Sequence, residues 1–220
     1  RGQTGIHIAL DEATKQGLDP DEAERSIVGN KGVSISSVKD LEQLFNDIDV
    51  TSYPLFIQTG ALSLPFLALM MSFLRNKNKS EAQLKGCIGA DPLAALVRNG
   101  RLSHSLETYY DALANVTSWA NENTPLLRTI LVDSSPYHNG GGSAVEELAF
   151  TLAQAVEYVR KSGERGLTID DIAAKMQFSF SIGSNLFMEI AKFRAVRMLW
   201  AKIVNAFGGN EEAQKMIIHA

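Results

Sequence analysis

Short apolar runs alternate with longer amphipathic segments along the whole chain, and this alternation constrains the fold more than any other feature. The runs are rich in Ile, Val, Phe and Tyr, as buried strands are. Seven candidate strands are residues 6–10, 33–36, 53–58, 85–89, 128–133, 178–182 and 216–219. Strand–helix alternation predicts a parallel sheet covered by helices. An open doubly wound sheet and a closed barrel both satisfy it.

The intervening segments carry helix-start signals. Four starts are predicted: at Asp19 before Pro20, at Ser37 with Asp40, at Ser143 with Glu146, and at Thr168 with Asp171. The glycine pattern of a dinucleotide-binding turn is missing, and the run 140–142 alone is weak evidence for phosphate binding. The pattern therefore indicates one α/β domain over residues 1–220, without a nucleotide-binding signature.

Composition narrows the class of protein. Hydrophobic residues make up 45% and charged residues 21%, which are globular proportions, and the net charge is −4. An acidic chain lacks the footprint of a nucleic-acid-binding protein. The apolar stretch 61–74 is too short for a membrane span and is expected to be a buried helix. The single cysteine, Cys87, fits a reducing compartment, and we expect a cytoplasmic protein.

Neither end of the sequence looks like a natural boundary. The chain starts at Arg1 without an initiator methionine, and its last residues resemble a strand that is just beginning. We therefore expect a fragment of a longer protein. A barrel fragment would carry unpaired strand edges, which invite self-association.

Barrel active sites lie at the carboxyl ends of strands, and this rule selects a short set of candidate residues. The set comprises Asp11, Glu12, Gln58, Thr59, Gly89, Ala90, Asp91, Asp133, Ser134, Tyr137, His138, Ser184 and Asn185. His138, beside Tyr137, is the histidine placed like a general acid, although a loop histidine without chemistry is an equally open interpretation. Asp91 before Pro92 is expected to cap a helix. No metal-binding spacing occurs, so no metal site is predicted.

The segment 184–207 is the most distinctive predicted helix. Apolar residues recur along it at three- and four-residue steps, which is typical of a helix covering a barrel. Asn185 and Glu189 lie four residues apart near its start, so they share one face. The start of such a helix points towards the barrel mouth, where this pair could hold a polar ligand group.

Three stretches resemble the methylmalonyl-CoA mutase family. They are residues 187–202 (FMEIAKFRAVRMLWAK), 147–160 (ELAFTLA continuing to EYVR), and the opening from 8–11 through 32–38. The resemblance keeps one order over nearly the whole chain. It implies a TIM-type (β/α)₈ barrel in which the seven predicted strands are strands two to eight. The first strand would precede Arg1, and a cobalamin-binding domain would follow Ala220. Adenosylcobalamin would supply the radical that rearranges an acyl-CoA.

The departures from the family pattern concern its site residues. Catalytic members read T-I-Q-N-D where this chain has C-I-G-A-D, so Gly89 replaces a glutamine that faces the substrate. His138 and Tyr137 match the family's G-Y-H only if the following loop is two residues shorter. Arg98 matches a substrate-binding arginine by position, with one residue missing before it. Asn185 and Glu189 match positions that contact the adenosyl group.

A lost glutamine and a remodelled loop resemble the family's small subunit. That subunit pairs with a catalytic large subunit, which would bind adenosylcobalamin, and does not itself react. The resemblance thus predicts a non-catalytic piece of a heterodimeric mutase of propionate metabolism, with no cofactor in this fragment. Two alternatives stay open. One is a fragment of a catalytic mutase with an unusual loop after Cys87, and the other is a related barrel enzyme acting on another acyl-CoA.

Overall fold

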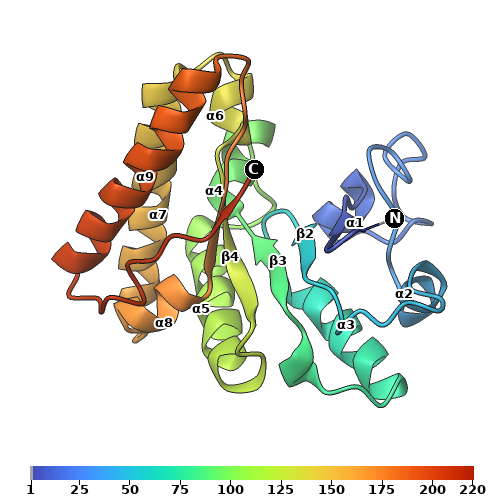
Figure 1. Ribbon diagram of the computed structural model, residues 1–220. Helices are drawn as coiled ribbons and strands as arrows, with labels where there is room; N and C mark the ends of the chain where they lie inside the picture. Colours follow the sequence, from blue (N-terminus) through green and yellow to red (C-terminus); the bar gives the residue numbers. More distant parts are fainter. Residues whose placement is uncertain (1) are drawn as a thin grey trace.

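Six parallel strands form one sheet in the computed structural model, which describes residues 2–220 (Figure 1). The spatial order is the chain order: β1 (Ile6–Ile8), β2 (Leu55–Gln58), β3 (Gly86–Ala90), β4 (Leu127–Asp133), β5 (Met176–Ser179) and β6 (Ile218–His219). Every neighbouring pair is parallel, with registers such as Ile57↔Ile88 and Phe178↔Ile218. Consecutive parallel neighbours are the order expected of a barrel wall rather than of a doubly wound sheet.

The sheet curls strongly. The ring of Phe56 on β2 stacks on the ring of His219 on β6, with centroids 3.7 Å apart. Strands lie about 4.8 Å apart, so a flat sheet would hold β2 and β6 roughly 19 Å from each other. His7 on β1 also meets His219, with centroids 5.6 Å apart. The six strands therefore form a half-barrel whose inner faces meet.

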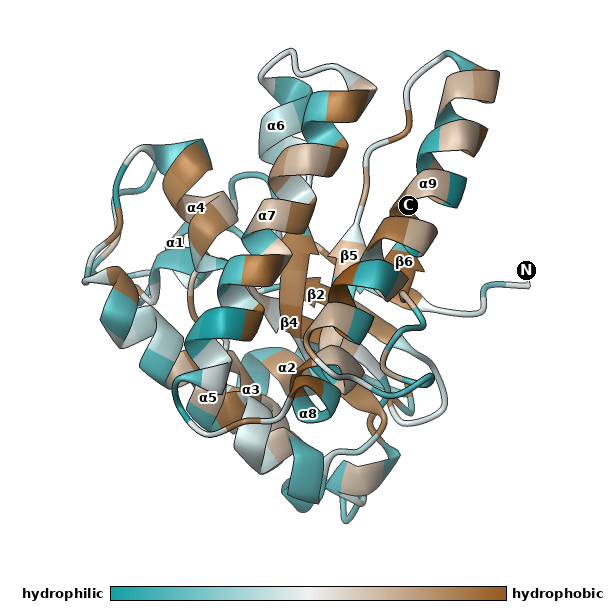
Figure 2. Cartoon of the chain, turned by 90° about the vertical axis from the view of Figure 1, so that its left-hand side faces the viewer, coloured by the Kyte–Doolittle hydropathy of each residue, from teal (hydrophilic) through white to brown (hydrophobic). Residues whose placement is uncertain are grey.

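Helices cover the outer face of the half-barrel. They are α1 (Glu12–Gln16), α2 (Val38–Leu44), α3 (Leu64–Asn76), the 3₁₀ turn η1 (Glu81–Gln83), α4 (Pro92–Asn99), α5 (Leu106–Asn123), α6 (Ser135–Asn139), α7 (Ala144–Gly163), α8 (Ile169–Ala174) and α9 (Leu186–Ala206). Two apolar clusters lie beneath them, one joining β1–β3 to α2 and α3, the other joining β4 and β5 to α5, α7 and α9. Figure 2 shows the apolar strands at the centre and the mixed surfaces of the helices around them.

Local sequence signals explain most helix starts. The pairs Ser37–Asp40, Ser143–Glu146 and Thr168–Asp171 all form capping boxes, as predicted. The apolar stretch 61–74 forms the buried helix α3. Within residues 2–220, no helix combines the length and the apolarity that crossing a bilayer requires.

Two predicted elements were wrong. Residues 33–36 are not a strand; they contribute one bridge, between Val33 and Leu10, and β1 pairs directly with β2. The backbone at Gly32 passes so close to β1 that a Cβ there would lie 2.3 Å from the carbonyl carbon of Leu10. The helix predicted after Asp19 is a series of turns, because residues 18–31 are mostly exposed and lack the apolar stripe that anchors a helix.

Candidate functional site

Asp91 is the polar centre of the barrel mouth. It caps α4 through Ala94 N (2.9 Å), as predicted, and also accepts the backbone N–H of Asp133 at 2.7 Å. Gln154 Nε2 (2.7 Å) and Tyr158 Oη (2.6 Å) of α7 donate to the same carboxylate. Burial raises the pKa of Asp91 to about 7, although the hydrogen bonds from Tyr158 and the two backbone amides oppose the shift. Asp91 thus ties α4, β4 and α7 together.

Arg98 is occupied by a neighbouring carboxylate. Its Nη2 donates to Asp133 Oδ2 at 2.7 Å and to Ser135 Oγ at 3.2 Å. The Arg98 side chain is 43% exposed, whereas Asp133 is buried. The arginine that the resemblance assigns to substrate therefore reaches the barrel mouth but already has an anionic partner from β4.

Tyr137 and His138 lie on α6, immediately after β4, and both point towards α7. Tyr137 Oη donates to Gln154 Oε1 at 2.7 Å, and burial raises the pKa of Tyr137 to about 12. His138 Nδ1 lies 3.3 Å from Glu147 Oε2. These contacts place the two candidates in one polar network, and a role of either residue in acid catalysis stays a prediction.

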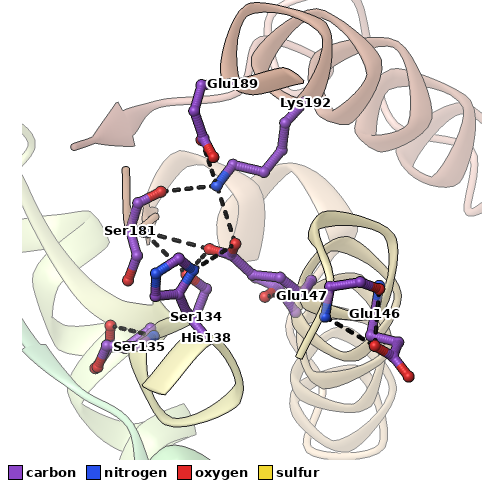
Figure 3. Close-up of polar contacts among 11 residues, drawn as sticks. Ser134, Ser135, His138, Glu146, Glu147, Ser181, Glu189 and Lys192 are labelled. Atoms are coloured by element: carbon purple, nitrogen blue, oxygen red, sulfur yellow. Dashed lines mark hydrogen bonds and ion pairs between the residues drawn. The ribbon is translucent and has the colours of Figure 1, made fainter. Parts of the chain in front are cut away.

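A buried ion-pair cluster joins α6, α7 and α9 at the carboxyl ends of β4 and β5 (Figure 3). Lys192 Nζ lies 2.9 Å from Glu147 Oε2, and both side chains are only 1% exposed. The same ammonium donates to the carbonyl of Ser181 at 2.7 Å, and Ser134 Oγ donates to Glu147 Oε1 at 2.5 Å. Burial alone would raise the pKa of Glu147, but the hydrogen bonds from Ser134 and Lys192 hold that pKa below its ordinary value.

Asn185 and Glu189 are also held within the chain. Asn185 caps α9 by accepting the backbone N–H of Met188 at 3.3 Å. Glu189 is buried, and its Oε2 lies 2.6 Å from Lys192 Nζ, a close electrostatic contact without regular hydrogen-bond angles. One ammonium thus serves two carboxylates, those of Glu147 and Glu189. Asn185 and Glu189 therefore lie at the start of one helix, as predicted, but they contact different groups, the backbone of Met188 and the ammonium of Lys192.

The inner face of the half-barrel is filled with side chains around Gly89. Phe56, Cys87 and Leu131 form a buried inner cluster, with exposed fractions of 6%, 0% and 2%. A Cβ at Gly89 would lie 2.6 Å from Leu131 Cβ and 2.9 Å from Cys87 Sγ, so Leu131 occupies the space beside the glycine. Burial also raises the pKa of Cys87 to about 12, which keeps its thiol protonated.

Sequence reasoning missed the ion-pair cluster. Glu147 and Lys192 sit on the buried faces of α7 and α9, where a charged residue at apolar spacing is the signal that points to a buried pair. No group of three or more His, Cys, Asp or Glu within residues 2–220 is arranged to hold a metal ion.

Comparison with known proteins places these features in a family. The sequence profile of methylmalonyl-CoA mutase matches residues 1–220. Similar curated proteins include the methylmalonyl-CoA mutases of Cereibacter sphaeroides (32% identity over 98% of this chain) and Escherichia coli K12 (33% over 96%). The methylmalonyl-CoA mutase large subunit of Propionibacterium freudenreichii subsp. shermanii is 32% identical over 94% of this chain. The chain covers 31%, 30% and 29% of these relatives' own lengths. The chain belongs to the methylmalonyl-CoA mutase family.

Proposed function

We propose that this chain is part of the small, non-catalytic subunit of a cobalamin-dependent methylmalonyl-CoA mutase, and that its half-barrel is a portion of a TIM-type (β/α)₈ barrel. The family membership supplies the reaction, the interconversion of methylmalonyl-CoA and succinyl-CoA. The half-barrel geometry is compatible with a barrel completed by further strands. The single cysteine, Cys87, is free and buried, which fits the reducing cytoplasm that we propose for this protein of propionate metabolism.

The filled inner face is the observation that carries the non-catalytic assignment. A mutase that acts on an acyl-CoA inside its barrel needs a channel wide enough for the pantetheine arm. Here the Phe56–His219 stack crosses the interior, and Leu131 fills the space beside Gly89. A cavity of about 860 Å³ lies elsewhere in the described residues, and neither Gly89 nor His138 lines it.

The residues that match the family's ligand-binding positions also support the non-catalytic assignment. Gly89 has no side chain to donate a hydrogen bond, and Arg98 is paired with Asp133. Glu189 already has a counter-ion within the chain, the ammonium of Lys192. These residues do not fit an adenosylcobalamin site. We assign no reaction step to this chain, and we propose that the large subunit binds the cofactor.

The proposed role is to hold the catalytic large subunit. Relatives named as large subunits show that mutases of this family are divided into subunits in some organisms. In such an assembly the small subunit contributes a barrel of matching shape without chemistry of its own.

Activity measurements on the full-length protein test this proposal. The full-length subunit is incubated with adenosylcobalamin and methylmalonyl-CoA, alone and together with its large subunit, and succinyl-CoA is quantified by chromatography. We expect no turnover by the subunit alone, and turnover with a stable 1:1 complex when the large subunit is present. Turnover by the subunit alone would refute the non-catalytic role.

The alternative of a catalytic fragment is supported by the placement of His138 and Tyr137 at the barrel mouth and by the similarity to relatives named as large subunits. The protein sequence downstream of Ala220 separates the two proposals. A cobalamin motif D-x-H-x-x-G in that region favours the catalytic alternative, and its absence favours the structural one. A related enzyme with another acyl-CoA substrate would instead turn over that substrate in the same assay.

A further inference from the structure

A cavity lies away from the ion-pair cluster, between α1, the start of α3, and α4 with the loop that follows it. Its volume of about 860 Å³ is in the range of small-molecule sites. Its apolar wall consists of Leu10, Ile35, Leu62, Phe66 and Leu69. Such a wall suits the carbon skeleton of an organic ligand.

The polar side of the cavity carries more basic than acidic side chains. Four basic side chains line it, Lys15, Lys31, Arg98 and Arg101, against two carboxylates, Glu12 and Asp19. An excess of positive charge in one cavity contrasts with the net charge of −4 of the whole chain. The cavity therefore selects for anions by local charge rather than by the overall charge of the protein.

Three of these cations lack an anionic partner. Among residues 2–220, Arg98 pairs with Asp133, but Lys15, Lys31 and Arg101 form no ion pair. Lys15 is half-buried, and burial lowers its pKa, as do the nearby charges of Arg98 and Lys31, while Glu12 and Asp11 oppose the shift. The half-buried Lys15 therefore lies in an unfavourable place for a cation, and a bound anion would offset that cost.

The start of α3 adds to the positive potential. Ser63, at its N-cap, makes no capping hydrogen bond through its side chain, and first-turn residues Pro65 and Phe66 line the cavity. The N-terminus of a 13-residue helix carries partial positive charge and free backbone N–H groups. It therefore adds positive potential to the cavity that the three unpaired cations also line.

We propose that this cavity binds a small organic phosphate, with the phosphate between Lys15, Lys31 and Arg101 and its carbon skeleton against the apolar wall. Lysine is a common phosphate ligand, and a dianion matches several separated cations better than a single carboxylate does. Arg98, which is also used in the argument for the subunit role, lines this cavity, but the proposed phosphate contacts are Lys15, Lys31 and Arg101.

Isothermal titration calorimetry on the full-length protein tests the site with three probes: phenyl phosphate, inorganic phosphate and glutarate. We expect phenyl phosphate to bind more tightly than inorganic phosphate, since only it uses the apolar wall, and glutarate to bind at least tenfold more weakly. The triple variant Lys15→Gln, Lys31→Gln, Arg101→Gln should weaken phenyl phosphate binding at least tenfold.

The matched control is the triple variant Lys77→Gln, Lys202→Gln, Arg194→Gln, which removes the same charges from exposed positions outside the cavity. It should bind phenyl phosphate like the wild type. Absence of phenyl phosphate binding overturns the proposal. This is also the result expected if another segment of the full-length protein fills the cavity. Equal binding of glutarate overturns the phosphate class, and equal loss in both triple variants overturns the site. Complex formation with the large subunit, measured on the same samples, reports separately on the subunit role.

Discussion

Single buried polar residues join this fold together, and Asp91 is the clearest case. Its pKa in the folded protein, about 7, lies above the ordinary value of 3.8, so the folded state binds the proton more tightly. The contribution of protonated Asp91 to the free energy of unfolding is then complete below pH 3.8 and is lost as the pH rises through 7. The Asp91→Asn variant cannot titrate, and its amide group would face the donors of Gln154 and Tyr158.

We therefore expect the stability difference between wild type and Asp91→Asn to decrease by up to about 4 kcal/mol between pH 4 and pH 8. Urea unfolding of both proteins at pH values across this range gives the difference directly. A difference that grows with pH would show that the hydrogen bonds outweigh burial and lower the pKa of Asp91 in the fold.

The second residue-scale prediction concerns the buried pair Lys192–Glu147. Lys192→Met leaves Glu147 and Glu189 without their counter-ion in a buried site, at a cost of about 3 kcal/mol. Lys215→Met is the matched control, because its partner Glu212 is 80% exposed, and the change there should stay within about 0.5 kcal/mol. Chemical unfolding at pH 7 measures both. Equal effects in the two variants would contradict the structural importance of the cluster.

At the scale of elements, sequence signals close to each other in the chain predicted structure well. Capping boxes gave the starts of α2, α7 and α8, because the two residues of each box interact directly across one helical turn. The predicted strand at 33–36 was wrong because tertiary contacts decide the pairing there, and the helix after Asp19 was wrong because the capping signal is not followed by an apolar stripe. In α9, the apolar spacing is typical of a helix covering a barrel, yet Leu186 and Ile190 near its start are 66% and 47% exposed.

In the candidate site, too, the sequence predicted which residues lie near one another but not their contacts. The rule about strand ends placed Asp91, Asp133, Tyr137 and His138 near one another, since parallel strands bring their carboxyl ends to one edge. It could not predict which partner each side chain chooses, because Glu147, Gln154 and Lys192 come from positions up to 63 residues away in the chain. Family resemblance supplied the positions of Gly89 and Arg98, but not the neighbours that fill the space around them.

Packing between β3 and β4 gives the element-scale prediction. Gly89→Ala would bring a Cβ to 2.6 Å from Leu131 Cβ, so we expect a loss of about 2 kcal/mol of stability. In the Leu131→Gly background the same change should cost about 1 kcal/mol less, because only the loss of Leu131 Cβ leaves room for the added methyl group. Gly163→Ala is the control, since nothing lies within 4 Å of its added Cβ. Additive effects of the two substitutions in calorimetric unfolding would contradict close contact between Gly89 and Leu131.

At the scale of the whole molecule, the half-barrel is a curved sheet with two edges. β1 and β6 each pair with one neighbouring strand, apart from the bridge between Leu10 and Val33. Backbone groups at such edges are free to pair with another chain. The exposed face of α9 is a second candidate contact, with Phe187 82% and Met198 60% exposed. Sheet edges bind a partner through backbone hydrogen bonds, whereas an apolar helix face binds it through side-chain packing. Substitutions can therefore distinguish the two contacts.

We expect the isolated chain of 220 residues to self-associate through its sheet edges. Sedimentation velocity between about 5 and 50 μM should show an average mass that rises with concentration, in the range where weak protein interfaces form. Ile217→Lys places a charge beside β6 and should shift the association to higher concentration, whereas Met198→Lys on α9 should leave it unchanged. The reverse ranking would assign the contact to α9. A single monomeric species at every concentration would mean that the curl of the sheet, closed by Phe56 and His219, already protects both edges.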